Sequence, residues 1–205
     1  MGKIFYLMGK SSVRKDTIYK KLLELEKTLH PMILYTTRPI REGETEGVEY
    51  YFVTEEQMKA LQAEGKIIEK RSYDTIHGVW NYFTADDDKI DLKNNQYLGI
   101  GTLESYEKLR AYFGKEVLVP LYIELEDGER LRRALFREQQ QKTPKYAELC
   151  RRYLADETDF SEENIAKAEI EERFLNVSSE LCVEEIRNYM RRINGDSLYA
   201  NHSSL

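Results

Sequence analysis

The stretch TTRPIREGETEGVEYYF, residues 36–52, combines two arginines with turn-forming residues at fixed spacing. Arg38 and Arg41 lie three positions apart, and a planar guanidinium group binds a phosphate through two parallel hydrogen bonds better than an ammonium group does. Gly43 and Gly47 mark turns that follow the arginines. The segment therefore predicts a loop that docks a phosphate.

The residues around this loop support the docking interpretation. An apolar run at residues 32–35 precedes it, and an extended run at residues 48–53 would hold the phenol of Tyr50 at a fixed distance from the arginines. A simpler interpretation is a solvated basic turn among acidic neighbours, Glu42, Glu44 and Glu46. We favour docking because the proline and glycines of the loop fix its geometry.

Length and charge narrow the classes of protein to consider. A chain of 205 residues with 41% hydrophobic content suits one enzyme-sized domain with a continuous core. The net charge of −6 disfavours nucleic-acid partners and anionic membranes, so an anionic ligand would have to meet a local cluster of basic residues.

The cysteines and the N-terminal segment indicate the cellular compartment. Cys150 and Cys182 lack CxxC spacing, which favours free thiols in a reducing compartment. Residues 4–8 are too short for a signal sequence or a membrane span. We therefore expect a cytoplasmic protein without a membrane partner.

Hydrophobic periodicity predicts an α/β fold with a mainly parallel sheet. A strand at residues 4–8 leads into a helix with an apolar stripe at Ile18, Leu22, Leu25 and Leu29. Thr54 and Gln57 form a capping box that opens a helix ending at Gly65. The further expected elements are strands at 67–73, 79–83, 97–100, 117–125 and 174–177, and helices at 103–113, 129–141, after Pro144, after Ser161 and at 180–193.

The loop between the first strand and the first helix stands where a phosphate-binding P-loop would lie. In the pattern GxxxxGK[ST], loop amides and a lysine hold the phosphates and a hydroxyl binds magnesium. Lys15 fits the lysine position, whereas Arg14 replaces the second glycine and Asp16 replaces the hydroxyl residue, so we expect weaker ATP binding. Thr17 could restore the hydroxyl, or Asp16 could bind magnesium through water. A strand-turn-helix junction with lysines but no nucleotide is the simpler alternative. The candidate ATP-binding residues of this loop are Gly9, Lys10, Ser11, Ser12, Val13, Arg14, Lys15, Asp16 and Thr17.

The spaced pattern TTRxxRxGExxGxxYxF resembles the signature of guanylate kinases, and the later elements follow the order of that family over most of the chain. The resemblance implies a P-loop kinase fold in one domain, residues 1–205, with a mainly parallel sheet core, a small mixed acceptor-binding lobe and a helical lid. The expected boundaries are 1–33, 96–128 and 160–194 for the core, 34–90 for the lobe, 129–159 for the lid and 195–205 for a C-terminal tail.

By the same resemblance, one set of residues would bind the acceptor GMP. Arg38, Arg41 and Tyr50 would hold its phosphate and Glu44 would shape the pocket, while His77 stands near a phosphate-contacting tyrosine of the family. Glu69 matches the family's base-reading carboxylate. A carboxylate accepts hydrogen bonds from the N1–H and N2–H₂ donors of guanine but repels the acceptor edge of adenine. The alternative for Glu69 is a solvent-facing strand residue.

A second set would act on the donor ATP and its Mg²⁺. The resemblance implies that Lys15, Arg38, Arg137 and Arg152 surround the transferred phosphoryl group and that Asn176 faces the donor adenine. The arginine-rich run at residues 130–137 resembles the family's mobile lid, with a basic surface helix as the alternative. The sequence leaves the magnesium ligands and the oligomeric state open.

Several positions depart from the family pattern. Leu34 and Val79 stand where the family has serine, and Gly99-Ile100-Gly101 stands where it has Asp-Ile-Asp. Thr102 or Glu104 could substitute for the missing acids, and we assign Trp80 to packing of the lobe.

The interpretation that follows is phosphorylation of GMP to GDP by ATP. Two alternatives stay open: a non-catalytic guanylate-kinase-like module that binds phosphopeptides, which the altered loop and missing acids favour, and a kinase for another phosphate monoester or ribose phosphate.

Overall fold

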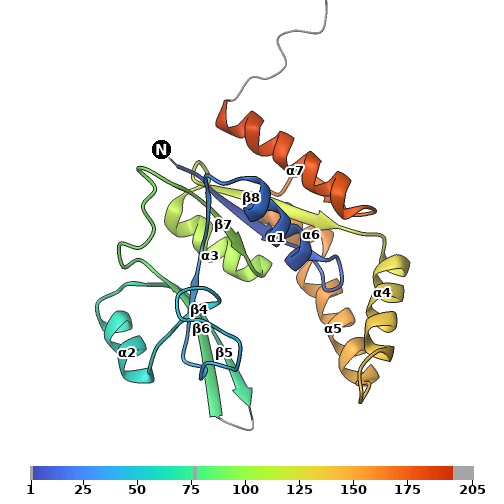
Figure 1. Ribbon diagram of the computed structural model, residues 1–205, viewed down its shortest axis with the longest axis horizontal. Helices are drawn as coiled ribbons and strands as arrows, with labels where there is room; N and C mark the ends of the chain where they lie inside the picture. The colour runs from blue at the N-terminus through green and yellow to red at the C-terminus, as the bar shows by residue number, and fades with distance from the viewer. Residues whose placement is uncertain (1, 76–77, 196–205) are drawn as a thin grey trace, which may run out of the picture. The chain divides into compact units, whose positions relative to one another are not determined.

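The computed structural model describes residues 2–75 and 78–195, which form an α/β fold (Figure 1). A five-stranded sheet has the order β2-β7-β1-β8-β9, and a four-stranded sheet has the order β4-β3-β6-β5. The chain divides into two compact units: Met1–Tyr6 with Thr28–Val119, and Leu7–Lys27 with Pro120–Leu205. None of the helices in the described ranges is long and apolar enough to cross a membrane.

The first unit contains the mixed sheet. Strand β3 (Leu34–Thr36) pairs in parallel with β4 (Tyr50–Phe52) and antiparallel with β6 (Gly78–Ala85), which also pairs antiparallel with β5 (Ile67–Thr75). Helix α2 (Glu55–Ala63) packs against this sheet through a core cluster of Tyr35, Met58, Phe83 and Ala85. The unit also holds the parallel pair β2 (Leu29–Pro31) and β7 (Gln96–Ile100), and helix α3 (Leu103–Phe113).

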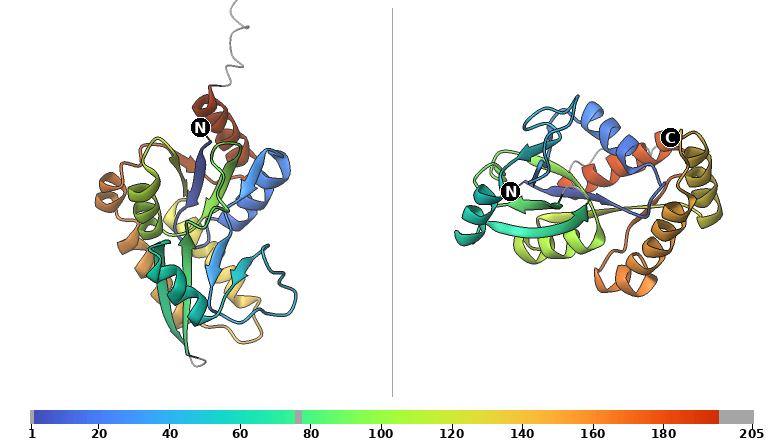
Figure 2. Two further views of the ribbon diagram at one scale, coloured as in Figure 1. Left: turned by 90° about the vertical axis from the view of Figure 1, so that its left-hand side faces the viewer. Right: turned by 90° about the horizontal axis from the view of Figure 1, so that it is seen from below.

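The second unit is built mainly of helices. Strand β8 (Leu118–Glu124) pairs in parallel with β9 (Arg173–Leu175), and α1 (Lys15–Leu25) lies beside α7 (Ser179–Asn194), as Figure 1 and Figure 2 show. Helix α4 (Asp127–Gln139) contacts α5 (Tyr146–Asp159), and the short α6 (Glu162–Lys167) follows. The division between the units falls within strand β1 (Ile4–Met8), which leads into α1 and is buried along its whole length.

The structure confirms the α/β class and most of the predicted elements. Helix α3 has the predicted bounds because the Thr102 hydroxyl caps its first turn and Gly114 ends it. The capping box of Thr54 and Gln57 is formed, with both of its hydrogen bonds present. Helix α4 begins two residues earlier than expected, because the Glu126 carboxylate accepts hydrogen bonds from the amides of the first turn.

Two predictions near the loops were wrong. Leu29 does not continue the apolar stripe of α1, because the helix ends at Leu25 and Leu29 begins β2. The extended run predicted for 48–53 is a strand only at Tyr50–Phe52, since Gly47 and Val48 still belong to a turn. Strand β3 was not predicted. The division of the chain into core, acceptor lobe and lid stays a prediction.

Candidate functional site

The loop between β1 and α1 contains a left-handed residue at the position where the P-loop pattern has glycine. Arg14 lies in the left-handed region at φ 61° and ψ 36°, where a residue with a side chain is strained. This is the conformation that glycine adopts freely, as the sequence pattern predicted for this position. A Cβ atom on Gly9 would lie 2.3 Å from the carbonyl oxygen of Ile123, so the loop needs glycine there as well.

Lys15 is the first residue of α1 and directly follows this loop. Its Nζ donates hydrogen bonds to the carbonyl oxygens of Gly9 at 2.5 Å and Lys10 at 3.0 Å. Burial lowers the pKa of the Lys15 ammonium group, and the nearby carboxylates of Asp156 and Asp16 oppose that shift. An anion that entered the loop would stabilise the charged form of the Lys15 ammonium group and oppose the effect of burial.

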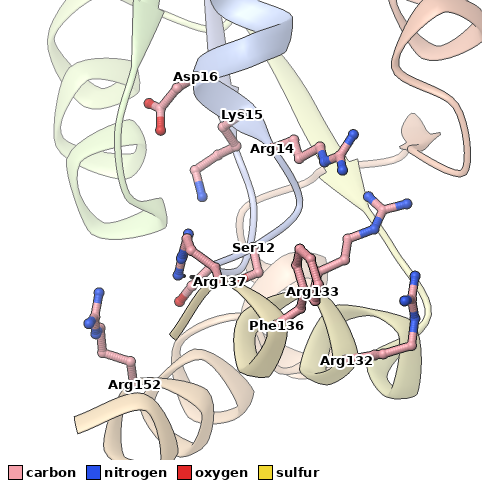
Figure 3. Close-up of a pocket in the computed structure, with 10 residues that line it drawn as sticks. Ser12, Arg14, Lys15, Asp16, Arg132, Arg133, Phe136, Arg137 and Arg152 are labelled. Carbon is pink, nitrogen blue, oxygen red and sulfur yellow. Dashed lines mark hydrogen bonds between the residues drawn. The ribbon is translucent and has the colours of Figure 1, made fainter. Parts of the chain in front are cut away.

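A cavity of about 570 Å³ opens beside the loop (Figure 3). It is lined by most of the basic residues that were predicted to act on the donor ATP. Five arginines and Lys15 make it strongly positive. Figure 3 shows the side chain of Arg14 extending away from the ammonium group of Lys15, so Arg14 does not cover that amine. The lining residues are Ser11, Ser12, Arg14, Lys15, Asp16, Arg132, Arg133, Phe136, Arg137 and Arg152.

Helices α4 and α5 place their arginines against the loop. Arg137 on α4 donates from Nη2 to the Ser12 hydroxyl at 3.3 Å, and Arg152 on α5 pairs through Nε with Glu148 at 3.3 Å. Arg132 and Arg133 both pair with Glu129, and these contacts lower the pKa of the Glu129 carboxyl to about 2. The predicted lid arginines and the loop therefore form one pocket.

Two other loop residues contact acidic side chains of the same helices. Lys10 pairs with Asp127 at 3.4 Å and with Glu157 at 2.9 Å. The backbone amide of Ser11 donates to the Asp156 carboxylate at 2.8 Å, and the Ser11 hydroxyl donates to the same oxygen. These acids also surround Arg130, whose side chain is buried between Asp127, Asp156 and Glu157.

The remaining residues predicted for the donor site have structural contacts or face solvent. The amide nitrogen of Asn176, which is fully buried, donates to the carbonyl oxygen of Val13 at 2.7 Å and so supports the loop. Val13 is also buried. Thr17 is exposed on α1 and is not among the residues that line the cavity. The proposed contact of Asn176 with adenine stays a prediction.

In the other unit, the two arginines of residues 36–52 differ sharply. Arg38 is 3% exposed and forms a bidentate pair with Glu44, from Nη1 at 3.0 Å and Nη2 at 2.7 Å. Hydrogen bonding to Glu44 raises the pKa of Arg38, and the reciprocal contact lowers the pKa of the Glu44 carboxyl. Arg41 is exposed, and its guanidinium carbon lies 5.8 Å from the ring centroid of Trp80. The structure thus leaves Arg41 more accessible to a phosphate than Arg38.

Tyr50 lies beside Arg38, as the spacing predicted. The guanidinium carbon of Arg38 is 5.5 Å from the centre of the Tyr50 ring, and Tyr50 contacts Tyr82 edge to face. Burial raises the pKa of the Tyr50 phenol, so this group keeps its proton at neutral pH and can donate a hydrogen bond.

Glu69 is not the solvent-facing strand residue of the simpler interpretation. Its side chain is completely buried, Oε1 accepts a hydrogen bond from the Thr84 hydroxyl at 3.1 Å, and Oε2 accepts one from the Ser105 hydroxyl at 3.1 Å. The Nε atom of Arg71 lies 3.3 Å from Oε2 and adds an ion pair. Among the described residues, the carboxylate therefore has three partners.

A cavity of about 380 Å³ lies next to this cluster, and its walls are mostly aromatic. Its lining residues are Leu34, Tyr50, Arg71, Tyr73, Trp80, Tyr82 and Ile100. Trp80, which we assigned to packing, therefore lines this cavity and also contacts the guanidinium group of Arg41.

The structure explains why glycines stand at positions 99 and 101, where the family has Asp-Ile-Asp. A Cβ atom on Gly99 would lie 2.6 Å from Cδ2 of Tyr6, and one on Gly101 would lie 2.0 Å from the Tyr6 hydroxyl. The Tyr6 side chain therefore fills the space that larger residues at these positions would need. Thr102 caps α3 and Glu104 pairs with Lys108 on the exposed face of that helix.

The described residues that line the two cavities above include neither Val79 nor a histidine. His77 lies outside the described residues, and Val79 is exposed at the start of β6. Within residues 2–75 and 78–195 there is no group of three or more His, Cys, Asp or Glu side chains that could hold a metal ion.

Sequence reasoning missed three residues that shape these sites: Tyr6, Arg71 and Asp156. Tyr6 and Asp156 carried no usable signal, because each acts on a distant part of the chain. Arg71 could have been found, because it lies two positions after Glu69 and therefore on the same face of the strand.

The chain is similar in sequence to known guanylate kinases. The guanylate kinase family model matches residues 1–90. The guanylate kinase of Parasynechococcus marenigrum is 30% identical over 186 residues, which cover 90% of this chain and 86% of that protein. The chain belongs to the guanylate kinase family.

Other guanylate kinases match shorter parts of the chain. That of Oceanobacillus iheyensis is 37% identical over 97 residues, which cover 46% of this chain and 45% of the relative. That of Legionella pneumophila is 38% identical over 68 residues, which cover 33% of this chain and 32% of the relative. The chain thus aligns with under half of the length of these two relatives.

A solved guanylate kinase supports the fold over nearly the whole chain. The crystal structure of guanylate kinase from Anaplasma phagocytophilum covers 97% of this chain and 88% of its own, with a TM-score of 0.61 and 23% identity. The fold of the family is therefore present beyond residues 1–90, in the part that contains the helices with the arginines.

Proposed function

We propose that this member of the guanylate kinase family transfers the γ-phosphoryl group of ATP to GMP, giving ADP and GDP. The observation that carries the proposal is the cavity in which Lys15 and five arginines surround a strand-loop-helix turn. Phosphoryl transfer needs little covalent chemistry from a protein, because positioning and charge stabilisation supply most of the catalysis.

Each basic group has a role that its position supports. Lys15 would leave its two carbonyl partners and reach the donor phosphates, while Arg137 and Arg152 would stabilise the charge on the transferred group. Loop amides with α1 behind them favour an anion at the same place. Arg38, enclosed by its pair with Glu44, would act mainly by shaping the acceptor loop.

The residues present fit a magnesium ion that arrives with ATP. Mg²⁺ in kinases is held by one or two carboxylates together with substrate phosphates and water, and Asp16 is a carboxylate that lines the cavity beside Lys15. When bound, the ion would supply positive charge that offsets the charge of the phosphates. Asp16 is therefore the residue we propose to hold it, directly or through water.

The acceptor would bind in the other unit. The exposed Arg41 and the protonated Tyr50 would bind the phosphate of GMP, with Glu44 fixing the loop between them. The aromatic cavity beside them offers stacking surfaces for a base.

The test is release of ADP from ATP in the presence of GMP and magnesium, with Lys15→Met compared to Lys20→Met. Lys15 lines the donor cavity, whereas Lys20 is exposed on the same helix. We expect Lys20→Met to keep the wild-type rate and Lys15→Met to lose at least about a hundredfold in kcat, because it removes a charge from the transition state. Equal rates for the two folded variants would contradict the proposal.

A further inference from the structure

The charged side chain that lines the aromatic cavity is the cation Arg71, whereas the sequence predicted the carboxylate of Glu69 as the group that reads the base. We propose that Arg71 reads the base of the acceptor nucleotide, and that Glu69 positions Arg71 instead of contacting the base itself. This inference rests on the proposed function, because it names the group that selects the acceptor of that reaction.

Glu69 is closed to a ligand. Its side chain is 0% exposed, and each carboxylate oxygen already accepts a hydroxyl hydrogen bond, from Thr84 and from Ser105. Both hydroxyl donors are themselves buried. A base that displaced them would leave buried polar groups without partners, which is unfavourable.

Arg71, in contrast, is open to the cavity. Its side chain is 15% exposed, it lines the cavity of about 380 Å³, and it is the one charged side chain among the described residues of that lining. Its Nε atom is close enough to Glu69 for an ion pair but makes no hydrogen bond within the described part of the chain. Glu69 therefore fixes the guanidinium group by charge without using up its donors.

Guanine and adenine present different groups to a guanidinium group. A guanidinium group donates two hydrogen bonds to O6 and N7 of guanine, whereas the N6 amino group of adenine is a donor and repels it. Tyr73, Trp80 and Tyr82 supply aromatic surface on which the ring can stack. A cavity with arginine as its charged group thus selects the acceptor edge of guanine.

The end of β7, which also lines the cavity, presents no acid to it. The Tyr6 side chain occupies the space beside Gly99 and Gly101, and the next lining residue, Ile100, is apolar. Leu34 is apolar as well. Among the described residues that line the cavity, none is a carboxylate that could accept hydrogen bonds from N1–H and N2–H₂ of guanine.

Two nucleotide analogues separate the two modes of recognition. IMP keeps O6 and N7 but lacks the 2-amino group, and 7-deaza-GMP keeps the 2-amino group but lacks N7. If Arg71 reads the base, the wild-type KM should be about tenfold or more higher for 7-deaza-GMP than for GMP, and IMP should lie within about threefold of GMP. If Glu69 reads the base directly, IMP should be the poor substrate and 7-deaza-GMP should match GMP, which would overturn the inference.

Variants test the same point within one strand. In Arg71→Met, the difference between GMP and 7-deaza-GMP should fall to about twofold, because methionine has no donor for N7, and kcat should change little, because the phosphate contacts remain. Glu69→Gln should reduce that difference and leave the ratio of IMP to GMP unchanged. Lys70→Gln, an exposed neighbour on β5, is the matched control and should behave as wild type.

Calorimetric binding of the three nucleotides distinguishes failure of the inference from failure of the proposed function. If the protein turns over no acceptor but binds GMP and IMP about tenfold more tightly than 7-deaza-GMP, the proposed function is wrong and the assignment of Arg71 holds. Equal affinity for all three nucleotides, or binding of none, would overturn the assignment. The comparison of the three nucleotides on the wild-type protein tests the assignment of Arg71 even if a variant fails to fold.

Discussion

The carboxylate of Asp156 on α5 accepts hydrogen bonds from both the backbone amide and the hydroxyl of Ser11 in the loop before α1. Backbone amides of such a loop are the groups that would bind a phosphate, and here one of them is already bound to an acid. A donor nucleotide must therefore compete with Asp156 for this amide. The same carboxylate pairs with the buried Arg130, so the competition also involves the contact between α4 and α5.

We predict that Asp156→Asn tightens binding of ATP several-fold, because it removes a negative charge from the place where phosphates would lie. Calorimetry with a non-hydrolysable ATP analogue measures the effect. Asp159→Asn, an exposed residue of the same helix, is the matched control and should leave the affinity unchanged. Weaker binding by folded Asp156→Asn would show that the carboxylate supports the nucleotide-bound form of the loop.

A second prediction concerns Arg14, which has a left-handed backbone at φ 61°. Arg14→Gly should raise the free energy of unfolding by about 1 kcal/mol, because glycine adopts this conformation without strain. We also expect tighter ATP binding and faster turnover in Arg14→Gly. Loss of activity in this variant would instead indicate that the Arg14 side chain contacts the donor phosphates.

Arg14→Ala separates the two effects of that residue. It removes the long side chain and keeps the strained backbone, so it should improve ATP binding without stabilising the fold. Thermal unfolding and ATP titration of the three proteins, measured in parallel, distinguish strain from obstruction of the loop.

The two arginines of the acceptor loop should respond differently to alanine. Arg41→Ala should raise the KM for GMP by roughly tenfold or more without changing stability, because Arg41 is exposed and a charge-assisted contact to phosphate is worth about 1.5–3 kcal/mol. Arg38→Ala should raise this KM and also lower the free energy of unfolding by about 1–3 kcal/mol, since it leaves Glu44 without its bidentate partner. Steady-state kinetics combined with denaturant titration would contradict this account if both variants were equally stable.

The two thiols should differ in reactivity and in their dependence on pH. Cys150 is exposed, whereas burial raises the pKa of the Cys182 thiol to about 12. Because a raised pKa keeps this thiol protonated, a rise in pH from 7 to 9 should not create reactive thiolate at Cys182. Titration with a thiol reagent should find one rapidly reacting thiol in the folded protein and two after unfolding, and two equally fast thiols at pH 7 would show that Cys182 is accessible.

Local signals in the sequence predicted much of the fold. The caps of α2 and α3 are encoded within a few residues, at Thr54, Gln57, Thr102 and Gly114, so the bounds of these helices could be predicted closely. The end of α1 could not, because Leu25 and Leu29 continue its apolar spacing although Leu29 packs in a different strand. Pairing with β7 decides that outcome, and a partner 67 positions away leaves no local signal.

In the candidate sites, too, contacts between residues distant in sequence could not be predicted. The loop at Lys15 and the arginines of α4 and α5 were predicted from motifs, and the structure brings them together around one cavity. The orientation of Glu69 was not predictable, because its hydrogen bonds come from Thr84 and from Ser105, 36 positions away. The pairing of Arg38 with Glu44 depends in the same way on how the loop folds, and it makes two arginines with similar sequence surroundings unequal.

The central claim is that the protein phosphorylates GMP, and it is tested most directly by identifying the product from a panel of acceptors. Purified protein with magnesium and ATP would be offered GMP, AMP, CMP, UMP and a ribose phosphate, and nucleotide products would be separated by chromatography. We predict that GDP and ADP form in equal amounts and that GMP is used at least about tenfold more efficiently than any other acceptor. Equal rates across the panel, or no diphosphate product from GMP despite measurable binding of GMP, would contradict the account.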